Sequence, residues 1–198
     1  MSAPRRIGVL GGSFDPPHAG HLAAAEAAVA QLSLDQVRVV PAARAPLRDA
    51  GPRASAADRL ALLRLAFGDR PWAEVDDRET RRGGVSYSVD TARELAAEHP
   101  GAELYWILGA DQLARLHLWR EAAELCRLAR FAVLARDGRP GEVDPSLGAL
   151  ARVERLRAPE VRASSTEIRR ALAAGRDAGK ALPPSVAAAI QARSLYRD

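Results

Sequence analysis

Residues 11–22, GGSFDPPHAGHL, constrain the fold of this chain more than any other stretch. They follow the apolar run 7–10, which predicts a short buried strand, and they precede the alanine-rich run 23–32, which predicts a helix. The stretch is therefore a strand-to-helix turn at the start of an α/β unit. Glycines let the backbone adopt positive φ and approach a ligand closely. The N–H groups and the positive dipole end at the start of the helix predict a site for an anion such as phosphate.

Two histidines of this turn, His18 and His21, are the first candidates for catalysis. Side chains three positions apart project from one face of a helix, so two imidazoles beside a phosphate-sized hole favour chemistry at phosphorus. Histidines near helix starts are also often plain surface residues, and the spacing alone leaves both interpretations open. The stretch lacks the Gly-Lys-Ser/Thr ending of a P-loop and the G-x-G-x-x-G of a dinucleotide-binding turn, which excludes those two kinds of site.

The rest of the chain alternates between predicted strands and helices. Further apolar runs predict strands at residues 37–41, 72–75, 104–108, 131–134 and 153–156. A strand, a helix and a strand in succession imply a right-handed parallel crossover. We therefore expect a single nucleotide-handling domain over residues 1–198, with an α/β, Rossmann-like fold in which a mostly parallel central sheet carries helices on both faces.

The connecting segments carry predictions of their own. Residues 42–54 lack periodicity and predict a loop whose length is a hint of function. Ser55 predicts the N-cap of the next helix, and residues 79–84 predict a polar turn. The proline pair at residues 183–184 predicts the start of a last helix that includes Leu195.

Charge and cysteine content narrow the classes of function. The formal net charge is +4, and Lys180 is the only lysine among 29 basic residues. Arginine side chains are well suited to binding phosphate or nucleic acid. The arginines form no basic run, however, so we interpret their number as a compositional bias. The single cysteine, Cys126, excludes an internal disulfide and a cysteine metal cluster, and we interpret it as a packed helix residue. With no apolar run of membrane-spanning length and no signal-peptide pattern, we expect a cytoplasmic protein without membrane or nucleic-acid partners.

Two motifs at opposite ends of the chain resemble those of one enzyme family. Residues 11–22 resemble the G-G-[ST]-F-D-P-x-H-x-G-H-L signature of the H-x-G-H nucleotidyltransferases, and residues 163–169, ASSTEIR, resemble I-S-S-T-x-[IL]-R. The first motif is shared with pantetheine-phosphate adenylyltransferases and cytidylyltransferases, but nearly the whole chain resembles bacterial nicotinate mononucleotide adenylyltransferases. The resemblance implies transfer of AMP from ATP to nicotinate mononucleotide. The products would be nicotinate adenine dinucleotide and pyrophosphate, in NAD biosynthesis.

The resemblance also implies which residues bind ATP. His18 and His21 would donate to the α-phosphate as charge builds there, and Mg²⁺ would bridge phosphate oxygens without a dedicated protein site. Hydroxyls and N–H groups at the start of a helix would hold the other phosphates, although an ordinary helix cap explains Ser and Thr equally well. The implied ATP-binding set is Gly11, Gly12, Ser13, Phe14, Gly109, Asp111, Arg136, Ser165, Thr166 and Arg169.

Acceptor binding is implied for a second set of residues. Residues 86–91, SYSVDT, resemble the family's S-Y-[ST]-x-[DN]-T segment beside the pyridine carboxylate, and a helix cap by Ser88 is the alternative. Trp119 would stack on the pyridine ring, although a core tryptophan is equally ordinary. Arg48 keeps a cation in the loop that meets the mononucleotide phosphate, but Leu47 stands where the family has histidine. The implied acceptor-binding set is Arg48, Ser86, Tyr87, Ser88 and Trp119.

Two other functions stay open at this point. The same chemistry could use nicotinamide mononucleotide or pantetheine 4′-phosphate as acceptor. The choice between the two pyridine nucleotides depends on the recognition of one carboxylate. A non-catalytic RNA-binding module would use the arginines, and it predicts steeply salt-dependent binding. That reading leaves both motifs unexplained, and the sequence has no basic patch interleaved with aromatics. Oligomeric state cannot be read from the sequence.

Overall fold

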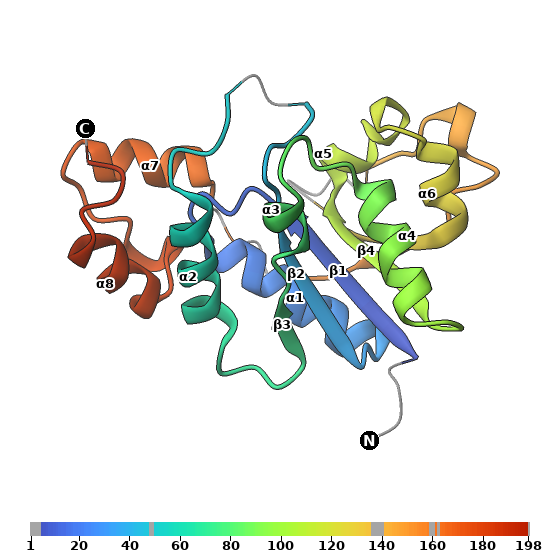
Figure 1. The fold of residues 1–198 in the computed structure, drawn as a ribbon, viewed down its shortest axis with the longest axis horizontal. Coiled ribbons are helices and arrows are strands. Elements are labelled where there is room, and N and C mark those ends of the chain that lie inside the picture. Colours follow the sequence, from blue (N-terminus) through green and yellow to red (C-terminus); the bar gives the residue numbers. More distant parts are fainter. Residues whose placement is uncertain (1–4, 48–49, 136–140, 159–160, 162, 198) are drawn as a thin grey trace.

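A parallel β-sheet forms the centre of the structure (Figure 1). The computed structural model describes residues 5–47, 50–135, 141–158, 161 and 163–197. In this part of the chain six strands lie in the order β3-β2-β1-β4-β5-β6, and every neighbouring pair is parallel. The strands are β1 (Arg6–Gly12), β2 (Gln36–Pro41), β3 (Ala73–Val75), β4 (Glu103–Gly109), β5 (Ala129–Leu134) and β6 (Val153–Leu156). The α/β, Rossmann-like fold expected from the sequence is confirmed.

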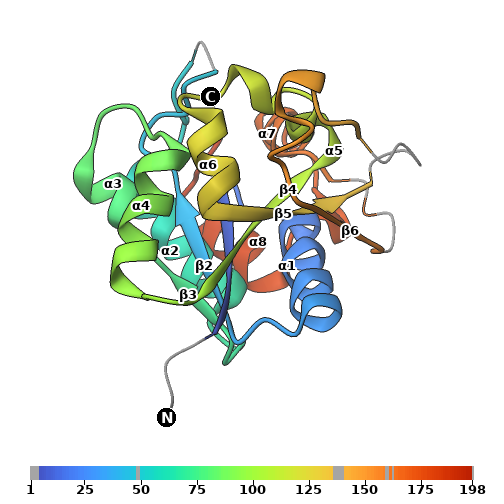
Figure 2. The same ribbon diagram turned by 90° about the vertical axis from the view of Figure 1, so that its right-hand side faces the viewer.

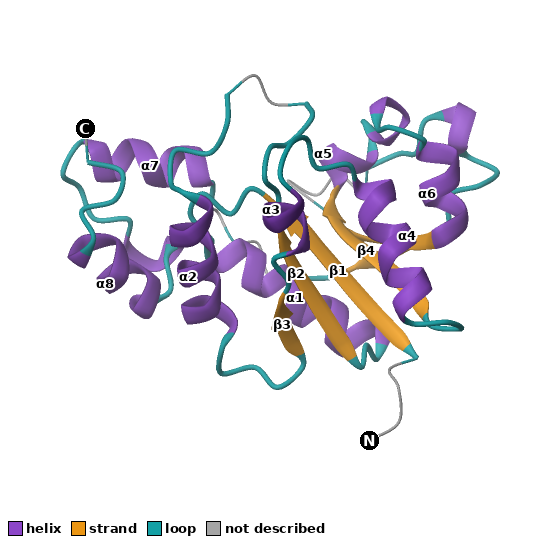
Figure 3. Ribbon diagram, in the orientation of Figure 1, coloured by secondary structure: helices purple, strands orange, loops and turns teal. Residues whose placement is uncertain are grey.

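Helices cover both faces of the sheet, and loops join them at its edges (Figures 2 and 3). The α-helices are α1 (Ala19–Leu32), α2 (Ala56–Phe67), α3 (Arg78–Arg82), α4 (Ser88–Glu98), α5 (Ala110–Leu113), α6 (Ala122–Leu128), α7 (Ser165–Ala173) and α8 (Pro184–Ala192). Short 3₁₀ helices are η1 (Leu116–Leu118), η2 (Pro145–Leu147) and η3 (Gly179–Ala181).

Alternating side chains of the central strands divide the core into two layers. Along β4, Trp106 and Leu108 pack with α4, α5 and α6, whereas Tyr105 and Ile107 face the layer of α1, α2, α7 and α8. Successive side chains of a strand point to opposite faces, and both faces of a parallel sheet are buried, so the strands read as apolar runs. This burial makes the strands easy to find in the sequence.

The order of the strands places a crevice between β1 and β4. From β1 the chain moves outward through β2 and β3, and then returns to add β4, β5 and β6 on the other side. In open parallel sheets, ligands bind beyond the carboxyl ends of the strands where the direction of winding changes. The turn 11–22 follows β1, and Gly109 and Asp111 follow β4. The fold therefore brings two predicted parts of the ATP site to one place.

Three sequence-based expectations about local structure are wrong. Residues 79–84 are not simply a polar turn, because most of them belong to helix α3, in which Arg78 and Glu79 are buried. Charged side chains such as these are expected at the surface. Arg78 can be buried because its Nε donates to Asp76 Oδ2 at 2.8 Å, and an ion pair of this kind permits burial. The last helix ends at Ala192, so Leu195 lies beyond it. Tyr87, not Ser88, is the N-cap of α4.

Other expectations about local structure are confirmed. Ser55 caps α2, and its hydroxyl accepts the N–H of Asp58 at 3.1 Å. Cys126 is buried in α6. Among the described residues, no helix has both the length and the apolar character needed to cross a membrane.

Candidate active site at the carboxyl edge of the sheet

The turn after β1 is a compact loop built around Phe14. Phe14 has φ 47° and is buried, and its ring meets the ring of His21 edge-on with centroids 4.8 Å apart. A side chain at Gly12 would place its Cβ 3.3 Å from the Phe14 ring. Gly12 and Phe14, both predicted to bind ATP, are therefore also needed to shape the loop that carries the histidines.

His18 and His21 lie together, although only His21 belongs to the helix. His18 is the N-cap of α1, and the two rings stack with centroids 3.7 Å apart at an angle of 24°. The backbone N–H of His18 donates to Nδ1 of His21 at 3.1 Å. A nitrogen that accepts carries no proton, so the neutral His21 ring holds its proton on Nε2. The backbone thus presets His21 as an N–H donor through Nε2.

Gly20 lies beneath the histidine pair, and sequence reasoning gave it no role of its own. A Cβ at Gly20 would lie 3.1 Å from Cε1 and Nδ1 of the His18 ring and 4.0 Å from Cβ of Ala163. Contacts at 3.1 Å force the neighbour to shift. The glycine of the H-x-G-H motif therefore makes room for the His18 ring against the second motif.

Gly20→Ala tests this packing. Alanine is the better helix former by roughly 1 kcal/mol, so we expect no loss of stability, whereas a displaced catalytic ring lowers kcat by about tenfold. Gly148→Ala is the matched control, since Gly148 has helical backbone angles and a Cβ there makes only an ordinary contact, 3.5 Å from the carbonyl oxygen of Pro145. Thermal unfolding and turnover should be measured on both proteins. Normal turnover of Gly20→Ala would show that the His18 ring tolerates the shift.

Asp15 holds the loop together, and the sequence analysis missed it. Its side chain is 4% exposed. The carboxylate accepts the backbone N–H groups of Arg53 at 2.8 Å and Ala54 at 3.0 Å, and the hydroxyl of Tyr196 at 2.9 Å. Burial raises the pKa of the Tyr196 hydroxyl, and the neighbouring Asp15 charge raises it further. Asp15 therefore joins the loop after β1 to the loop before α2 and to the last part of the chain.

A buried arginine stands behind the same loop. Arg59 of α2 is 2% exposed and donates from Nη1 to the carbonyl oxygen of Ser13 at 2.8 Å. Burial lowers the pKa of Arg59, and the charge of Asp15 opposes that change. A buried cation requires a nearby anion, and Asp15 supplies it. No motif marks Arg59, so only its position in the fold reveals this role.

The second motif packs directly on the first. Ser165, the first residue of α7, donates its hydroxyl to the carbonyl oxygen of Pro16 at 2.9 Å. Arg169 donates from Nη1 to the carbonyl oxygen of Asp15 at 2.6 Å, and the same nitrogen lies 3.5 Å from the Asp15 carboxylate. Two stretches separated by about 150 residues thus form one surface.

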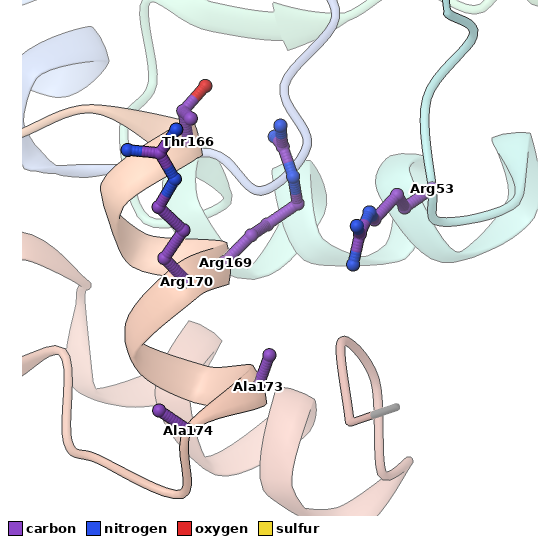
Figure 4. A pocket seen from close by; sticks show the side chains of 6 residues that line it. All are labelled: Arg53, Thr166, Arg169, Arg170, Ala173 and Ala174. Carbon is purple, nitrogen blue, oxygen red and sulfur yellow. The ribbon is translucent and has the colours of Figure 1, made fainter.

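A cavity of ≈ 550 Å³ opens beside α7 and is basic in character (Figure 4). Arg169 and Arg170 extend from α7, and Arg53 approaches from the segment that bonds to Asp15. The planar forks of arginine match phosphate oxygens. The full lining is Arg53, Thr166, Arg169, Arg170, Ala173 and Ala174. The cavity is suited to a polyanion, and it includes the predicted residues Thr166 and Arg169.

The donor set around this cavity does not suit a resident metal ion. Mg²⁺ prefers carboxylate, carbonyl and water oxygens, whereas the cavity is lined by three arginines, and the Asp15 carboxylate already accepts several donors. Within the described ranges, no group of three His, Cys, Asp or Glu side chains is arranged to hold a metal ion.

Gly109 and Asp111 lie at the end of β4, as expected. Gly109 is the N-cap of α5, and Asp111 is the second residue of that helix, so Asp111 is not the N-cap. A Cβ at Gly109 would lie 2.7 Å from Oδ1 of Asp111. The glycine therefore lets the exposed carboxylate of Asp111 fold back over the strand end.

The predicted acceptor residues gather at the start of α4. Tyr87 and Trp119 pack on the same core cluster, and the guanidinium of Arg120 lies 4.6 Å from the centre of the Tyr87 ring. Ser86 is buried, and its hydroxyl accepts the N–H of Ala43 at 2.9 Å. The structure thus brings Tyr87 against Arg120, the residue after Trp119, and ties Ser86 to the loop after β2.

Two predicted site residues, Arg48 and Arg136, lie outside the described residues. Leu47, which replaces the histidine of the family pattern, is 42% exposed. An exposed leucine in a functional loop lacks the donor that a histidine would offer to a phosphate. The mononucleotide phosphate must therefore be met by other groups of the chain.

Comparisons with known proteins agree with this geometry. A family model described as cytidylyltransferase-like matches residues 9–171. A protein of Opitutus terrae named "Probable nicotinate-nucleotide adenylyltransferase" is 43% identical over 97% of this chain and 98% of its own length. A protein of Rhodopirellula baltica with the same name is 39% identical over 96% of this chain and 93% of its own. The chain belongs to the nicotinate-nucleotide adenylyltransferases, within the cytidylyltransferase-like family.

A solved structure supports the fold of this adenylyltransferase family member. The nicotinic acid mononucleotide adenylyltransferase of Plasmodium falciparum, complexed with NaAD, superposes with a TM-score of 0.78. The alignment covers 97% of each chain at 19% sequence identity. At this level of identity the likeness establishes the fold. The roles of individual residues rest on the contacts described above.

Proposed function

We propose that residues 1–198 act as one cytoplasmic nucleotidyltransferase domain that transfers AMP from ATP to nicotinate mononucleotide. One observation carries the proposal: the hydroxyl of Ser165 and the guanidinium of Arg169 bond to the backbone of the loop that holds the histidines. This contact brings a basic cavity suited to phosphates next to a preset imidazole donor. Family membership supports the same reaction.

In the proposed reaction, a phosphate oxygen of the mononucleotide attacks the α-phosphorus of ATP in line. A new P–O bond forms as the bond to the β-phosphate oxygen breaks, and pyrophosphate leaves with that electron pair. A phosphate monoester is an adequate nucleophile, so the protein needs no covalent intermediate. The main difficulty is to bring two polyanions together and align them.

The residues of the chain divide this work between them. His21 donates from Nε2 to an α-phosphate oxygen as negative charge builds there, and His18 holds and assists it. Arg169 and Arg170 neutralise the β- and γ-phosphates, and the hydroxyl of Thr166 donates to them. ATP enters as its Mg²⁺ complex, so the metal is carried by substrate oxygens and screens further charge.

The acceptor is proposed to lie between α4 and Trp119. The free N–H groups at the start of a helix suit the pyridine carboxylate, and the indole of Trp119 suits the electron-poor ring. The half-buried position of Trp119, whose neighbour Arg120 lies over the Tyr87 ring, supports this placement. Asp111, at the end of β4, would bond the ribose of ATP.

Pyrophosphate release from Mg·ATP tests the proposal. Nicotinate mononucleotide, nicotinamide mononucleotide and pantetheine 4′-phosphate should be offered separately as acceptors. We expect release to be strongly favoured by the nicotinate compound. A helix N-terminus stabilises a carboxylate and gains little from a neutral amide.

The His21→Ala protein, purified in parallel, measures any activity contributed by enzymes of the expression host. A preference for another acceptor would keep the ATP half of the proposal and remove the roles of Trp119 and Ser88. No release with any acceptor, together with steeply salt-dependent binding to RNA, would instead support the binding module.

A further inference from the structure

Glu79 is a buried carboxyl group that the proposed reaction does not use. It lies in α3 with 5% of its surface exposed. The hydroxyl of Thr91 donates to its Oε1 at 2.6 Å, and the hydroxyl of Ser86 lies near enough to the carboxyl group to lower its pKa. Burial raises the pKa of Glu79, while Thr91 and Ser86 oppose that change. An inward-facing acid of this kind is costly unless its partners are fixed.

The two partners of Glu79 stand on either side of the start of α4. The hydrogen-bond ladder of the helix begins with the N–H of Asp90, which donates to the carbonyl oxygen of Tyr87 at 3.1 Å. The N–H groups of Ser88 and Val89 lie ahead of that first bond, as the leading N–H groups of any helix do. Glu79, which is not part of α4, therefore contacts residues on both sides of the turn that presents these two N–H groups.

The same carboxyl group also reaches the loop after β2 through Ser86. The Ser86 hydroxyl accepts the N–H of Ala43 at 2.9 Å, and the N–H of Ser86 donates to the carbonyl oxygen of Arg44 at 2.9 Å. Ser86 thus lies near Glu79 on one side and is bonded on the other to the first residues of the 42–54 loop. One carboxyl group connects α3, the start of α4 and the loop that the family uses for the acceptor phosphate.

Other carboxylates nearby do not make such a connection. Glu94, on the next turn of α4, pairs with Arg82 and Arg78 at the partly exposed outer side of the helices. The Arg82 guanidinium also donates to the hydroxyl of Thr91 at 3.2 Å, which orients that hydroxyl toward Glu79. Several charged groups therefore surround α4. Among the carboxylates of the described residues, Glu79 is the one that lies between Ser86 and Thr91.

We propose that Glu79 is a positioning residue for the acceptor: by bridging Ser86 and Thr91, it fixes the turn whose N–H groups recognise the pyridine carboxylate. The inference rests on the proposed function, since it assumes that the carboxylate lies at the start of α4. It assigns to Glu79 a part of the selectivity for the nicotinate over the nicotinamide compound. The inference assigns Glu79 no contact with ATP.

The test compares Glu79→Ala with Glu79→Gln and Thr91→Val. Glu79→Ala removes the bridge and Thr91→Val removes one end of it, so each should raise KM for nicotinate mononucleotide by about tenfold, the worth of a lost hydrogen bond. KM for ATP should stay within about twofold, because the ATP groups are untouched. Glu79→Gln keeps an amide oxygen that can accept from the Thr91 hydroxyl, so its KM should remain near that of the wild type. Calorimetric titration with nicotinate mononucleotide gives the same comparison without turnover.

Glu98→Ala is the matched control, since it removes a carboxylate from the same helix that pairs with Arg78 and not with Arg82 or Thr91. We expect the ratio of nicotinate to nicotinamide turnover to fall for Glu79→Ala and Thr91→Val and to hold for Glu98→Ala. Equal changes in the KM values for ATP and acceptor, or no change in either, would overturn the inference. If Glu79→Ala does not fold, the pair Thr91→Val and Glu79→Gln still decides. Failure of the wild-type protein to use either pyridine nucleotide would instead reject the proposed function.

Discussion

Replacing His21 with alanine is expected to lower kcat by about 10²–10³-fold, because a well-placed donor to developing phosphate charge contributes that much. The side chain is preset by the N–H of His18, which donates to Nδ1 and leaves the proton on Nε2. The alanine variant loses this donor, while the phosphate cavity beside α7 remains intact. KM for ATP should therefore change much less than kcat. Initial rates of pyrophosphate release under saturating substrates measure the effect.

Two further variants sharpen the His21 experiment. His21→Gln keeps an N–H donor on a side chain of similar reach, and we expect it to recover part of the lost rate. His99→Ala is the matched control, because His99 is the C-cap of α4 and contacts Arg38, away from the histidine loop. Near-normal turnover of His21→Ala would reject the assigned role. A loss of equal size in His99→Ala would attribute the effect to stability.

Asp15→Asn is expected to lower the free energy of unfolding by about 3–5 kcal/mol, since it removes the buried carboxylate that pairs with Arg169 at 3.5 Å and leaves charge uncompensated. It also removes a negative charge that favours the charged form of Arg59, which is buried behind the same loop. Asparagine keeps the shape of the side chain and one acceptor oxygen, but it cannot satisfy both backbone donors and the Tyr196 hydroxyl equally. The loop should loosen and turnover should fall with it. Urea-induced unfolding measures the stability, and rates taken well below the transition measure the activity.

Asp58→Asn provides the matched comparison for Asp15→Asn. Asp58 also pairs with an arginine, Arg193 at 3.0 Å, but on the surface of the protein. Pairs of that kind contribute about 0–1 kcal/mol. Equal, small losses for both variants would show that the buried pair is not what holds the loop.

Most of the fold could be predicted from the sequence because its strands are buried on both faces. Runs such as residues 104–108 and 131–134 are apolar throughout, and each became a strand of the sheet. The buried charges could not be predicted. Arg59 and Arg78 look like ordinary surface residues, because the anions that make their burial possible are brought to them only by the fold.

The candidate site divides in the same way. The two motifs could be found because their residues are adjacent in sequence, and the structure joins them through Ser165 and Arg169. Asp15 and Gly20 lie inside the first motif, but their roles depend on what packs against them. Glu79 belongs to a polar stretch that predicts a turn, and only its bonds to α4 reveal its burial. Contacts between distant segments leave little trace in one sequence.

The bond from Tyr196 to Asp15 spans 181 positions of the chain and makes the order of synthesis matter. The loop that carries the histidines leaves the ribosome long before residue 196 has been made, and until then its carboxylate lacks this partner. A nascent chain that ends before residue 196 lacks the hydroxyl that completes the loop, even where its sheet has formed.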